Sequence, residues 1–496
     1  MIPIPAQVRP VPAADFTIIS GTAVSAAPGA QEAVGLLRAA TGHPLPERAG
    51  AAEINMILDD GDNGDGHGDE GYKITIAADG VTVRAATPAG LFYAAQTLCQ
   101  LLPARTTLSR STPPVDGAMP AGGVTLVGGV TLPGGEIVDR PRFAYRGVML
   151  DVARHFWTVG EVERFIDGLA AYKINHLHLH LTDDQGWRLA IESRPRLTEV
   201  SGGKGTGVEG AGPGFYTQAD YAGLVDYAAR RFITVVPEID MPGHVNAAQV
   251  AYGELTASGE PVKARTDTEV GYSSLVADSD ETYAFVEDVI REVAALTPGP
   301  YLHIGGDEAQ ATTADDYRAF ITRVLPLVAK YGKRAVGWHE ITAVELPETA
   351  VPQFWWVEPS DEGTARAAAN GSKVIMSPAD RTYLDMKYTA DSPLGLDWAA
   401  LIDVERAYDW DPAIRLPGVG EQQLLGVEAV LWSETLRTLD DVLTMTFPRL
   451  PAIAEIGWSP RATHDWQSLR RRLAGHGPRW AANGIAFHRS PEIDWA

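Results

Sequence analysis

Residues Tyr301-Leu302-His303-Ile304-Gly305-Gly306-Asp307-Glu308 form a short apolar run that leads into two glycines and then two adjacent carboxylates. The run is typical of a buried strand, and a strand that ends in Gly-Gly lets another molecule approach its backbone closely. Two neighbouring acids repel each other and are costly to bury, so stability alone does not explain them. Because neighbouring residues of an extended chain point in different directions, the two acids can contact different parts of one ligand. The alternative is a solvated acid pair in an ordinary loop, and the rest of the sequence decides between the two.

Strand-like runs of this kind alternate with amphipathic helices from Asp139 onward. The expected strands are Arg146–Asp151, Ile174–Leu181, Ile233–Ile239, Tyr301–Gly305, Ala335–Trp338, Pro352–Trp356, Lys373–Met376 and Gly426–Trp432. The expected helices include Val159–Tyr172, Gln218–Arg231, Glu281–Leu296, Ala314–Tyr331 and Glu362–Asn370, and the last two crossovers are less regular. Eight strands with helical crossovers predict a (β/α)8 TIM barrel over residues 139–496, and such barrels carry their chemistry at the carboxyl ends of the strands.

Residues 1–138 predict a separate, small α+β domain. Tyr72–Ile76 and Val81–Arg84 alternate at period two around Asp79-Gly80, which indicates a β-hairpin, and Pro88 opens an amphipathic helix. The acidic stretch 59–71 has the composition of a calcium loop. Counted from Asp60, however, glycines stand at two positions where an EF-hand needs oxygen ligands. We therefore expect an acidic insertion there rather than a metal site.

The composition limits the partners of the chain. Its 496 residues carry a formal charge of −23 and include one cysteine. Nucleic acids and anionic membranes bind through clustered Lys and Arg, so we expect neither as a partner. One cysteine excludes an internal disulfide and a cysteine-based metal cluster, and no apolar run is long enough to span a membrane. The N-terminus lacks a signal-peptide pattern, which predicts a cytoplasmic protein, or a secreted one whose leader was removed. The sequence leaves open whether the protein is a monomer or a homodimer.

Polar and aromatic side chains follow every expected strand. In chain order the strand ends offer Arg154, Asp183, His244, Asp307 with Glu308, Trp338, Trp355, then Tyr383, Asp385 and Trp398, and finally Trp432 and Glu434. Flat apolar rings with carboxylates and an arginine between them suit a sugar, which has apolar C–H faces and a hydroxyl edge. Core packing is the alternative for any one tryptophan. The convergence of all the strand ends on one rim favours a carbohydrate site.

A second interpretation rests on His176, His178 and His180. Their period-two spacing places them on one face of a strand, and paired histidines of this kind bind zinc in metal-dependent hydrolases. Only His244 and His339 at the other strand ends offer further nitrogen ligands. We therefore expect these histidines to be structural or to support the site residues, and we predict no metal.

Six of these segments resemble, in the same order, the signature motifs of glycoside hydrolase family 20, the β-N-acetylhexosaminidases, and most closely its actinobacterial members. The motifs are Asp151-Val152-Ala153-Arg154-His155-Phe156, His178-Leu179-His180-Leu181-Thr182-Asp183-Asp184-Gln185, Pro237-Glu238-Ile239-Asp240-Met241-Pro242-Gly243-His244, His303-Ile304-Gly305-Gly306-Asp307-Glu308, Tyr383-Leu384-Asp385 and Leu431-Trp432-Ser433-Glu434. The resemblance covers residues 135–460 and extends to the small N-terminal domain.

The resemblance implies an exo-acting, retaining enzyme without cofactor that removes terminal GlcNAc or GalNAc from β-linked N-acetylhexosaminides. Its nucleophile is the substrate's own acetamido group, which forms an oxazolinium intermediate. Glu308 would be the general acid and base, Asp307 would orient the acetamido N–H, and Tyr383 would bind the acetamido oxygen. The other implied residues are Trp338, Trp355 and Trp432 around the acetamido methyl, Arg154, Asp385 and Glu434 on hydroxyls, Trp398 under the leaving sugar, and Asp183 and His244 behind Glu308. Whether Glu238, Asp240 and His303 are catalytic or structural stays open.

Three alternatives remain at this point. A relative within the family, of the chitobiase or lacto-N-biosidase type, would require a special leaving group. A metal-dependent hydrolase would lose its activity to a chelator. A carbohydrate-binding protein on an inactive barrel would not need the proton donor that Asp307, Glu308 and Tyr383 imply.

Overall fold

The computed structural model describes residues 1–59, 68–103 and 128–495. Most of the acidic insertion expected at 59–71 therefore lies outside the described residues. Within the described residues, no helix is long and apolar enough to cross a membrane. The chain forms two compact units, and each combines segments that are distant in the sequence. The first unit contains residues 1–142, 170–173 and 450–496, and the second contains residues 143–169 and 174–449.

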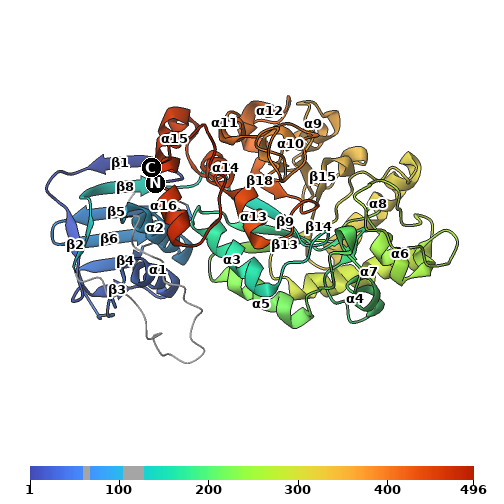
Figure 1. Cartoon of the computed structure of the whole chain (residues 1–496), viewed down its shortest axis with the longest axis horizontal. Helices are drawn as coiled ribbons and strands as arrows, with labels where there is room; N and C mark the ends of the chain where they lie inside the picture. The colour runs from blue at the N-terminus through green and yellow to red at the C-terminus, as the bar shows by residue number, and fades with distance from the viewer. Residues whose placement is uncertain (60–67, 104–127, 496) are drawn as a thin grey trace. The chain divides into compact units, whose positions relative to one another are not determined.

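The first unit is built on a six-stranded sheet, coloured blue to teal in Figure 1. In spatial order its strands are β1 (Gln7–Pro10), β8 (Gly135–Asp139), β5 (Tyr72–Ala77), β6 (Gly80–Ala85), β4 (Ile54–Leu58) and β3 (Val24–Ala26). Helices α1 (Gln31–Thr41) and α2 (Pro88–Leu101) pack against each other, and α2 packs against the central strands. The predicted hairpin is present as the antiparallel pair β5 and β6. A separate pair, β2 (Phe16–Ile18) and β7 (Val130–Leu132), completes the strands of this unit.

A buried carboxylate shows why distant segments belong to the first unit. Asp139, the last residue of β8, is 0% exposed and accepts hydrogen bonds from three parts of the chain. Tyr72 Oη and Lys173 Nζ lie 2.6 and 2.8 Å from Asp139 Oδ2, and Trp458 Nε1 lies 2.9 Å from Oδ1. A buried acid needs such partners, so this single residue joins residues 170–173 and 450–496 to the sheet. The predicted domain boundary between residues 138 and 139 stays a prediction.

The second unit contains the predicted barrel. Eight strands close in the order β10-β13-β14-β15-β16-β17-β18-β9, and every neighbouring pair is parallel. They are β9 (Tyr145–Asp151), β10 (His176–His180), β13 (Thr234–Glu238), β14 (Tyr301–His303), β15 (Arg334–Trp338), β16 (Val351–Phe354), β17 (Val374–Met376) and β18 (Leu424–Leu431). Each overlaps one of the expected strands. The predicted fold class, a (β/α)8 barrel preceded by a small α+β domain, is confirmed.

The five helices that we expected between the strands are present as α3 (Val159–Ala170), α5 (Gln218–Ala229), α7 (Asp280–Leu296), α8 (Ala314–Lys330) and α9 (Glu362–Ala369). Thr217, Ser279 and Thr313 begin three of them by accepting a hydrogen bond from the first turn, as N-cap residues do. In the last crossover, between β17 and β18, the α-helices are short: α10 (Ala379–Thr382), α11 (Val404–Tyr408) and α12 (Pro412–Arg415).

The remaining elements lie in the loops and near the C-terminus. They are β11 (Thr182–Asp183), β12 (Gly186–Trp187), α4 (Arg196–Ser201), η1 (Val208–Gly210), α6 (Asn246–Ala251), η2 (Gly253–Leu255), η3 (His339–Ala343), η4 (Glu421–Gln423), α13 (Leu439–Thr446), α14 (Arg449–Trp458), η5 (Arg461–Thr463), α15 (Trp466–Ala474) and α16 (Gly477–Ala482).

The barrel interior changes character along the strands. Near the amino ends it holds a buried apolar cluster of Tyr145, Val236, Tyr301, Val336, Val351 and Ile375. Two residues further along three of these strands the buried side chains are Glu238, His303 and Gln353. Because side chains alternate along a strand, these polar groups lie on the same inward face. The barrel is therefore closed by apolar side chains at one end and becomes polar toward the other, where the candidate site lies.

Candidate active site

The site residues predicted from the sequence all stand at the carboxyl ends of the barrel strands or in the loops that follow those ends. They are Arg154 after β9, Asp183 after β10, His244 after β13, Asp307 and Glu308 after β14, Trp338 at the end of β15, Trp355 after β16, Tyr383, Asp385 and Trp398 after β17, and Trp432 and Glu434 after β18. This is the edge at which barrel enzymes place their chemistry.

The backbone after β14 makes a turn that only glycine permits. Gly305 and Gly306 have φ values of 62° and 105°. A Cβ at Gly305 would lie 1.7 Å from Asp240 Oδ1, and the same oxygen accepts a hydrogen bond of 3.0 Å from the Gly306 N–H. Glu308 also has a positive φ of 45°, which is strained for a residue with a side chain. The side chain of Asp240 thus occupies the space left by Gly305 and holds the turn that presents Asp307 and Glu308.

One imidazole lies between the acid pair and a supporting carboxylate. His244 Nε2 is 3.7 Å from Asp307 Oδ2 and 3.5 Å from Glu308 Oε2, and His244 Nδ1 is 3.2 Å from Asp183 Oδ1. Burial lowers the pKa of His244, but the carboxylates of Asp183 and Asp307 outweigh it and raise the pKa well above its usual value. His244 is therefore positively charged and balances the negative charges around it.

The two adjacent acids have different surroundings. The Asp307 side chain is 9% exposed, whereas that of Glu308 is 31% exposed. Burial raises the pKa of Asp307 to about 7, the His244 imidazolium opposes this rise, and the charges of Glu340 and Glu308 add to it. Asp307 Oδ1 has no hydrogen-bond partner although it is buried. An ionised Asp307 is thus costly in the free protein, and a group that brings positive charge or an N–H donor would relieve that cost.

Arg154 connects the acids to the aromatic side of the site. Its guanidinium lies 2.8 Å from Asp183 Oδ2 and 3.4 Å from Asp151 Oδ2, and its Nε donates to Gln185 Oε1 at 3.1 Å. The same guanidinium lies over the ring of Trp432, 4.9 Å from the centroid. Contacts of this kind fix the direction of a guanidinium, so Arg154 is held rigidly at the rim.

Five aromatic rings form a continuous set through consecutive contacts. Ring centroids are 5.9 Å apart for Trp338 and Trp432, 6.5 Å for Trp432 and Tyr383, 6.4 Å for Tyr383 and Trp355, and 6.1 Å for Trp355 and Trp398. Trp338 is 1% exposed and Trp355 8%, while Trp398 is 50% exposed. The set therefore runs from the barrel interior to the solvent. A site of the same size for a purely polar ligand would not need these rings.

Asp385, which is buried, and Glu434, which is half-buried, are acids that repel each other. Burial, with the charge of Glu434 added, raises the pKa of Asp385 well above its usual value, and burial also raises the pKa of Glu434 although Arg154 opposes this. Both carboxylate oxygens of Asp385 are buried without a hydrogen-bond partner. Native proteins rarely leave such atoms unpaired, so Asp385 is placed to receive hydrogen bonds from a ligand.

Sequence reasoning missed Glu340, which follows Trp338 and His339 at the end of β15. Both of its carboxylate oxygens accept from Trp355 Nε1, at 3.2 and 3.1 Å. Burial raises the pKa of Glu340 to about 7. The position of Glu340 directly after a predicted barrel strand was the one signal that it belongs to the site. That signal is weak, because solvated acids in ordinary loops often occupy the same position in a sequence.

Two of the three histidines of β10, His178 and His180, contact carboxylates, whereas His176 contacts the side-chain oxygen of Asn175. His178 and His180 are 0% exposed; His178 Nδ1 lies 2.9 Å from Glu428 Oε1, and His180 Nε2 lies 2.7 Å from Asp183 Oδ2. Among the described residues, His178, Glu238 and His303 form one of several groups close enough together to hold a metal ion. The imidazoles of this group face the carboxylate oxygens of Glu238 directly, so that buried carboxylate already has partners among the described side chains.

A parallel barrel with buried acids, a fixed arginine and a tryptophan-rich wall at the carboxyl ends of its strands belongs to the class of barrel enzymes that act on carbohydrates. The family models "Glycosyl hydrolase family 20, catalytic domain" and "Glycosyl hydrolase family 20, domain 2" match residues 143–319 with 311–461, and residues 1–140, respectively. The chain belongs to glycosyl hydrolase family 20, and it is a glycoside hydrolase. The predicted resemblance is confirmed.

Similar proteins span nearly the whole chain. A beta-N-acetylhexosaminidase from Cellulomonas fimi is 43% identical over 428 residues, which are 86% of this chain and 82% of that protein. Two solved structures of the Streptomyces plicatus enzyme, a mutant with the product GlcNAc and a complex with Thio-NAglucal, each match with a TM-score of 0.92 and 49% identity. Each match covers 100% of this chain and 97% of the Streptomyces chain.

Proposed function

We propose that this protein removes terminal β-linked N-acetylhexosamine residues from the non-reducing ends of glycans, with retention of configuration. The observation that carries the proposal is the meeting of the acid pair and the aromatic set at one end of the barrel. One buried acid with an unpaired oxygen, one partly exposed acid and five connected rings provide the groups that an acetamido sugar requires. The relative from Cellulomonas fimi is a beta-N-acetylhexosaminidase, and the Streptomyces plicatus relative is a beta-hexosaminidase that binds GlcNAc as its product.

Glu308 acts as the general acid and then as the general base in this proposal. It is the more exposed of the two acids, so it can reach the oxygen that joins the sugar to its leaving group. It first protonates that oxygen and later takes a proton from the attacking water. His244, 3.5 Å from Glu308 Oε2 and held by Asp183, limits how far the carboxyl group can turn.

Asp307 acts on the nucleophile, which is the carbonyl oxygen of the substrate's acetamido group. Most retaining glycosidases use a second carboxylate as the nucleophile, and family 20 is an exception. The unpaired Asp307 Oδ1 would accept the acetamido N–H and stabilise the positive charge that develops as the oxazolinium ring forms. Because ionised Asp307 is poorly solvated, its attraction to that charge is strong.

Tyr383 and the tryptophans hold the acetamido group in the attacking position. Tyr383 Oη would donate to the acetamido carbonyl oxygen, while Trp338, Trp355 and Trp432 would enclose the methyl group. Burial, with the charge of Asp385 added, raises the pKa of Tyr383 well above its usual value, so the phenol keeps its proton. Fixing an internal nucleophile in this way is worth up to roughly 7–11 kcal/mol in favourable intramolecular reactions.

The sugar hydroxyls would be held by Arg154, Asp385 and Glu434. Two of these are acids that repel each other in the free protein, and hydroxyl donors would satisfy them. Trp398, the exposed end of the aromatic set, would stack under the leaving sugar. Only one sugar would then be enclosed, which accounts for action at chain ends.

The test is steady-state kinetics with aryl β-N-acetylglucosaminides whose leaving groups differ in acidity. The Glu308→Gln variant is expected to lose several orders of magnitude in kcat/KM with poor leaving groups and much less with acidic phenols, which leave without protonation. An equal loss for every leaving group would rule out Glu308 as the acid. A thiazoline mimic of the oxazolinium is expected to inhibit the wild type strongly, and weak binding would count against the internal nucleophile.

A further inference from the structure

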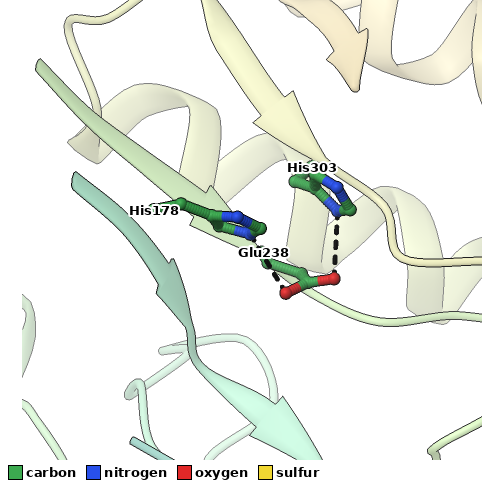
Figure 2. A group of neighbouring side chains, drawn as sticks. All are labelled: His178, Glu238 and His303. Carbon is green, nitrogen blue, oxygen red and sulfur yellow. Dashed lines mark ion pairs between the residues drawn. The ribbon is translucent and has the colours of Figure 1, made fainter. Parts of the chain in front are cut away.

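Glu238 is a buried carboxylate that no part of the proposed reaction uses. It is the last residue of β13 and is 0% exposed. Its carboxylate is approached by side chains from three other elements of the barrel. Figure 2 shows His178, from β10, and His303, from β14, pointing at its two oxygens, each at 3.0 Å. A buried acid with this many partners is not explained by packing, because an apolar side chain would fill the same space at lower cost.

Two further contacts connect Glu238 to the candidate site. Trp338 Nε1 donates a hydrogen bond to Glu238 Oε1 at 3.0 Å. His180 Nδ1 contacts Glu238 Oε2, and the other nitrogen of the same ring lies 2.7 Å from Asp183 Oδ2. Trp338 is part of the aromatic set, and Asp183 holds both Arg154, at 2.8 Å, and His244, at 3.2 Å. The carboxylate of Glu238 thus contacts Trp338, in the aromatic set, and His180, which contacts the Asp183 carboxylate that holds Arg154 and His244.

These contacts form a line of buried charges of alternating sign. It runs from Glu428 through His178, Glu238 and His180 to Asp183. Burial opposes the charged forms of both histidines, but the neighbouring carboxylates raise the pKa of His178 to about 9 and that of His180 well above its usual value. Burial also opposes the charged form of Glu238, which by itself would raise the pKa of this acid. The imidazoles of His180, His303 and His178 outweigh burial and hold the pKa of Glu238 well below its usual range.

We propose that Glu238 is a positioning residue: its carboxylate fixes Trp338 through the indole N–H and, through His180, fixes the orientation and charge of Asp183, which holds Arg154 and His244. The proposal rests on the roles assigned to these four residues under the proposed function. Glu238 itself touches no substrate. The His178 imidazole, from the neighbouring strand β10, lies between the carboxylates of Glu238 and Glu428, and Asp240, two residues further along the chain, is a buried acid that Glu238 repels.

The test compares two isosteric substitutions, Glu238→Gln and Glu428→Gln. Both remove a fully buried carboxylate that contacts His178. Glu428 otherwise contacts Tyr145 and Gln353, at 2.5 and 2.8 Å, and neither contact reaches Trp338, His180 or Asp183. A purely structural role predicts the same outcome for the two variants. Folded protein is verified by circular dichroism, and activity is expressed per site that binds a thiazoline inhibitor.

For Glu238→Gln we expect kcat to fall about 10- to 100-fold, the range that small misplacements of catalytic groups produce. The amide still offers an oxygen to Trp338, so KM should change little, whereas the pH profile of kcat/KM should shift because the charge beside His180 is lost. Glu428→Gln should keep kcat within about threefold and leave the pH profile in place. Equal losses in the two variants, or a Glu238→Gln enzyme with the wild-type kcat and pH profile, would overturn the proposal.

Two additions keep the test decisive. If Glu238→Gln does not fold, His180→Gln severs the contact with Asp183 and leaves Trp338 paired to Glu238; kcat should then fall and the pH profile should shift, and an unchanged profile would refute the proposal.

Prolonged treatment of the wild type with a chelator should leave its activity unchanged; loss of activity that zinc restores would make Glu238 a metal ligand instead. Wild-type turnover and thiazoline inhibition are measured in parallel, so failure of the proposed function is seen separately.

Discussion

Replacing Asp307 by Asn should make the protein more stable while it destroys activity. Asp307 is 7% exposed, one of its oxygens has no partner, and its burial raises its pKa from 3.8 to about 7. A carboxyl group whose pKa is higher in the folded state binds its proton more tightly there than in the unfolded chain. The folded protein therefore has its full stability below the pKa that Asp307 has in the unfolded chain. It loses stability as the pH rises through the higher pKa that Asp307 has in the folded state.

The size of the effect comes from the same shift. The difference between 3.8 and about 7 corresponds to about 4 kcal/mol of folding free energy above neutral pH, at about 1.4 kcal/mol for each tenfold change in proton affinity. Asn has nearly the same shape and cannot ionise, so it avoids this loss. We expect Asp307→Asn to be more stable than the wild type by roughly 2–4 kcal/mol near pH 8, and the gain should shrink toward pH 4.

Chemical denaturation monitored by tryptophan fluorescence at several pH values measures this directly. Asp315→Asn is the matched control, because the Asp315 side chain is 92% exposed and its replacement should change stability little at any of these pH values. Asp307→Asn should also lose most of its kcat on aryl β-N-acetylglucosaminides. The reasoning is refuted if the variant is no more stable than the wild type near pH 8, or if its gain is the same at every pH.

Three further outcomes are expected. Asp385→Asn should raise KM for the terminal sugar about 10- to 100-fold, because its buried oxygens then lose charge-assisted hydrogen bonds to hydroxyls; an unchanged KM would remove it from the site. Trp398→Ala should weaken turnover of chitooligosaccharides about 5- to 10-fold and leave small aryl glycosides nearly unaffected, and equal losses on both substrates would contradict stacking under the leaving sugar. Gly305→Ala should reduce the yield of folded, active enzyme, because its Cβ would lie 1.7 Å from Asp240 Oδ1; Gly332→Ala, which also has a positive φ but nothing within 4 Å, should cost about 1–2 kcal/mol and stay active.

Local patterns were enough to predict the barrel strands and the polar or aromatic residues at their carboxyl ends. A run such as Tyr301–Gly305 is apolar because a barrel strand is buried on both faces. This requirement can therefore be recognised from a few consecutive residues. The rule that parallel strands carry function at their carboxyl ends then groups Arg154, Asp307 and Trp432 without any coordinates. The same local patterns could not assign residues 450–496 to the first unit, because hydrogen bonds to Asp139 join positions far apart in the chain.

The sequence alone thus determined the order of strands, the family and the chemical groups at the rim, since each depends on short spacings or motifs. Only the tertiary structure decided how those groups are charged and held. Glu428 and His178 are 250 positions apart and form an ion pair only because β18 and β10 close the same barrel. Likewise, the adjacent Glu308 supplies only a small part of the rise in the pKa of Asp307 to about 7; burial is the main cause, and among groups from other strands His244 opposes the rise and Glu340 adds to it. Charge and burial are sums over all neighbours in space, and the chain acquires those neighbours only when the barrel closes.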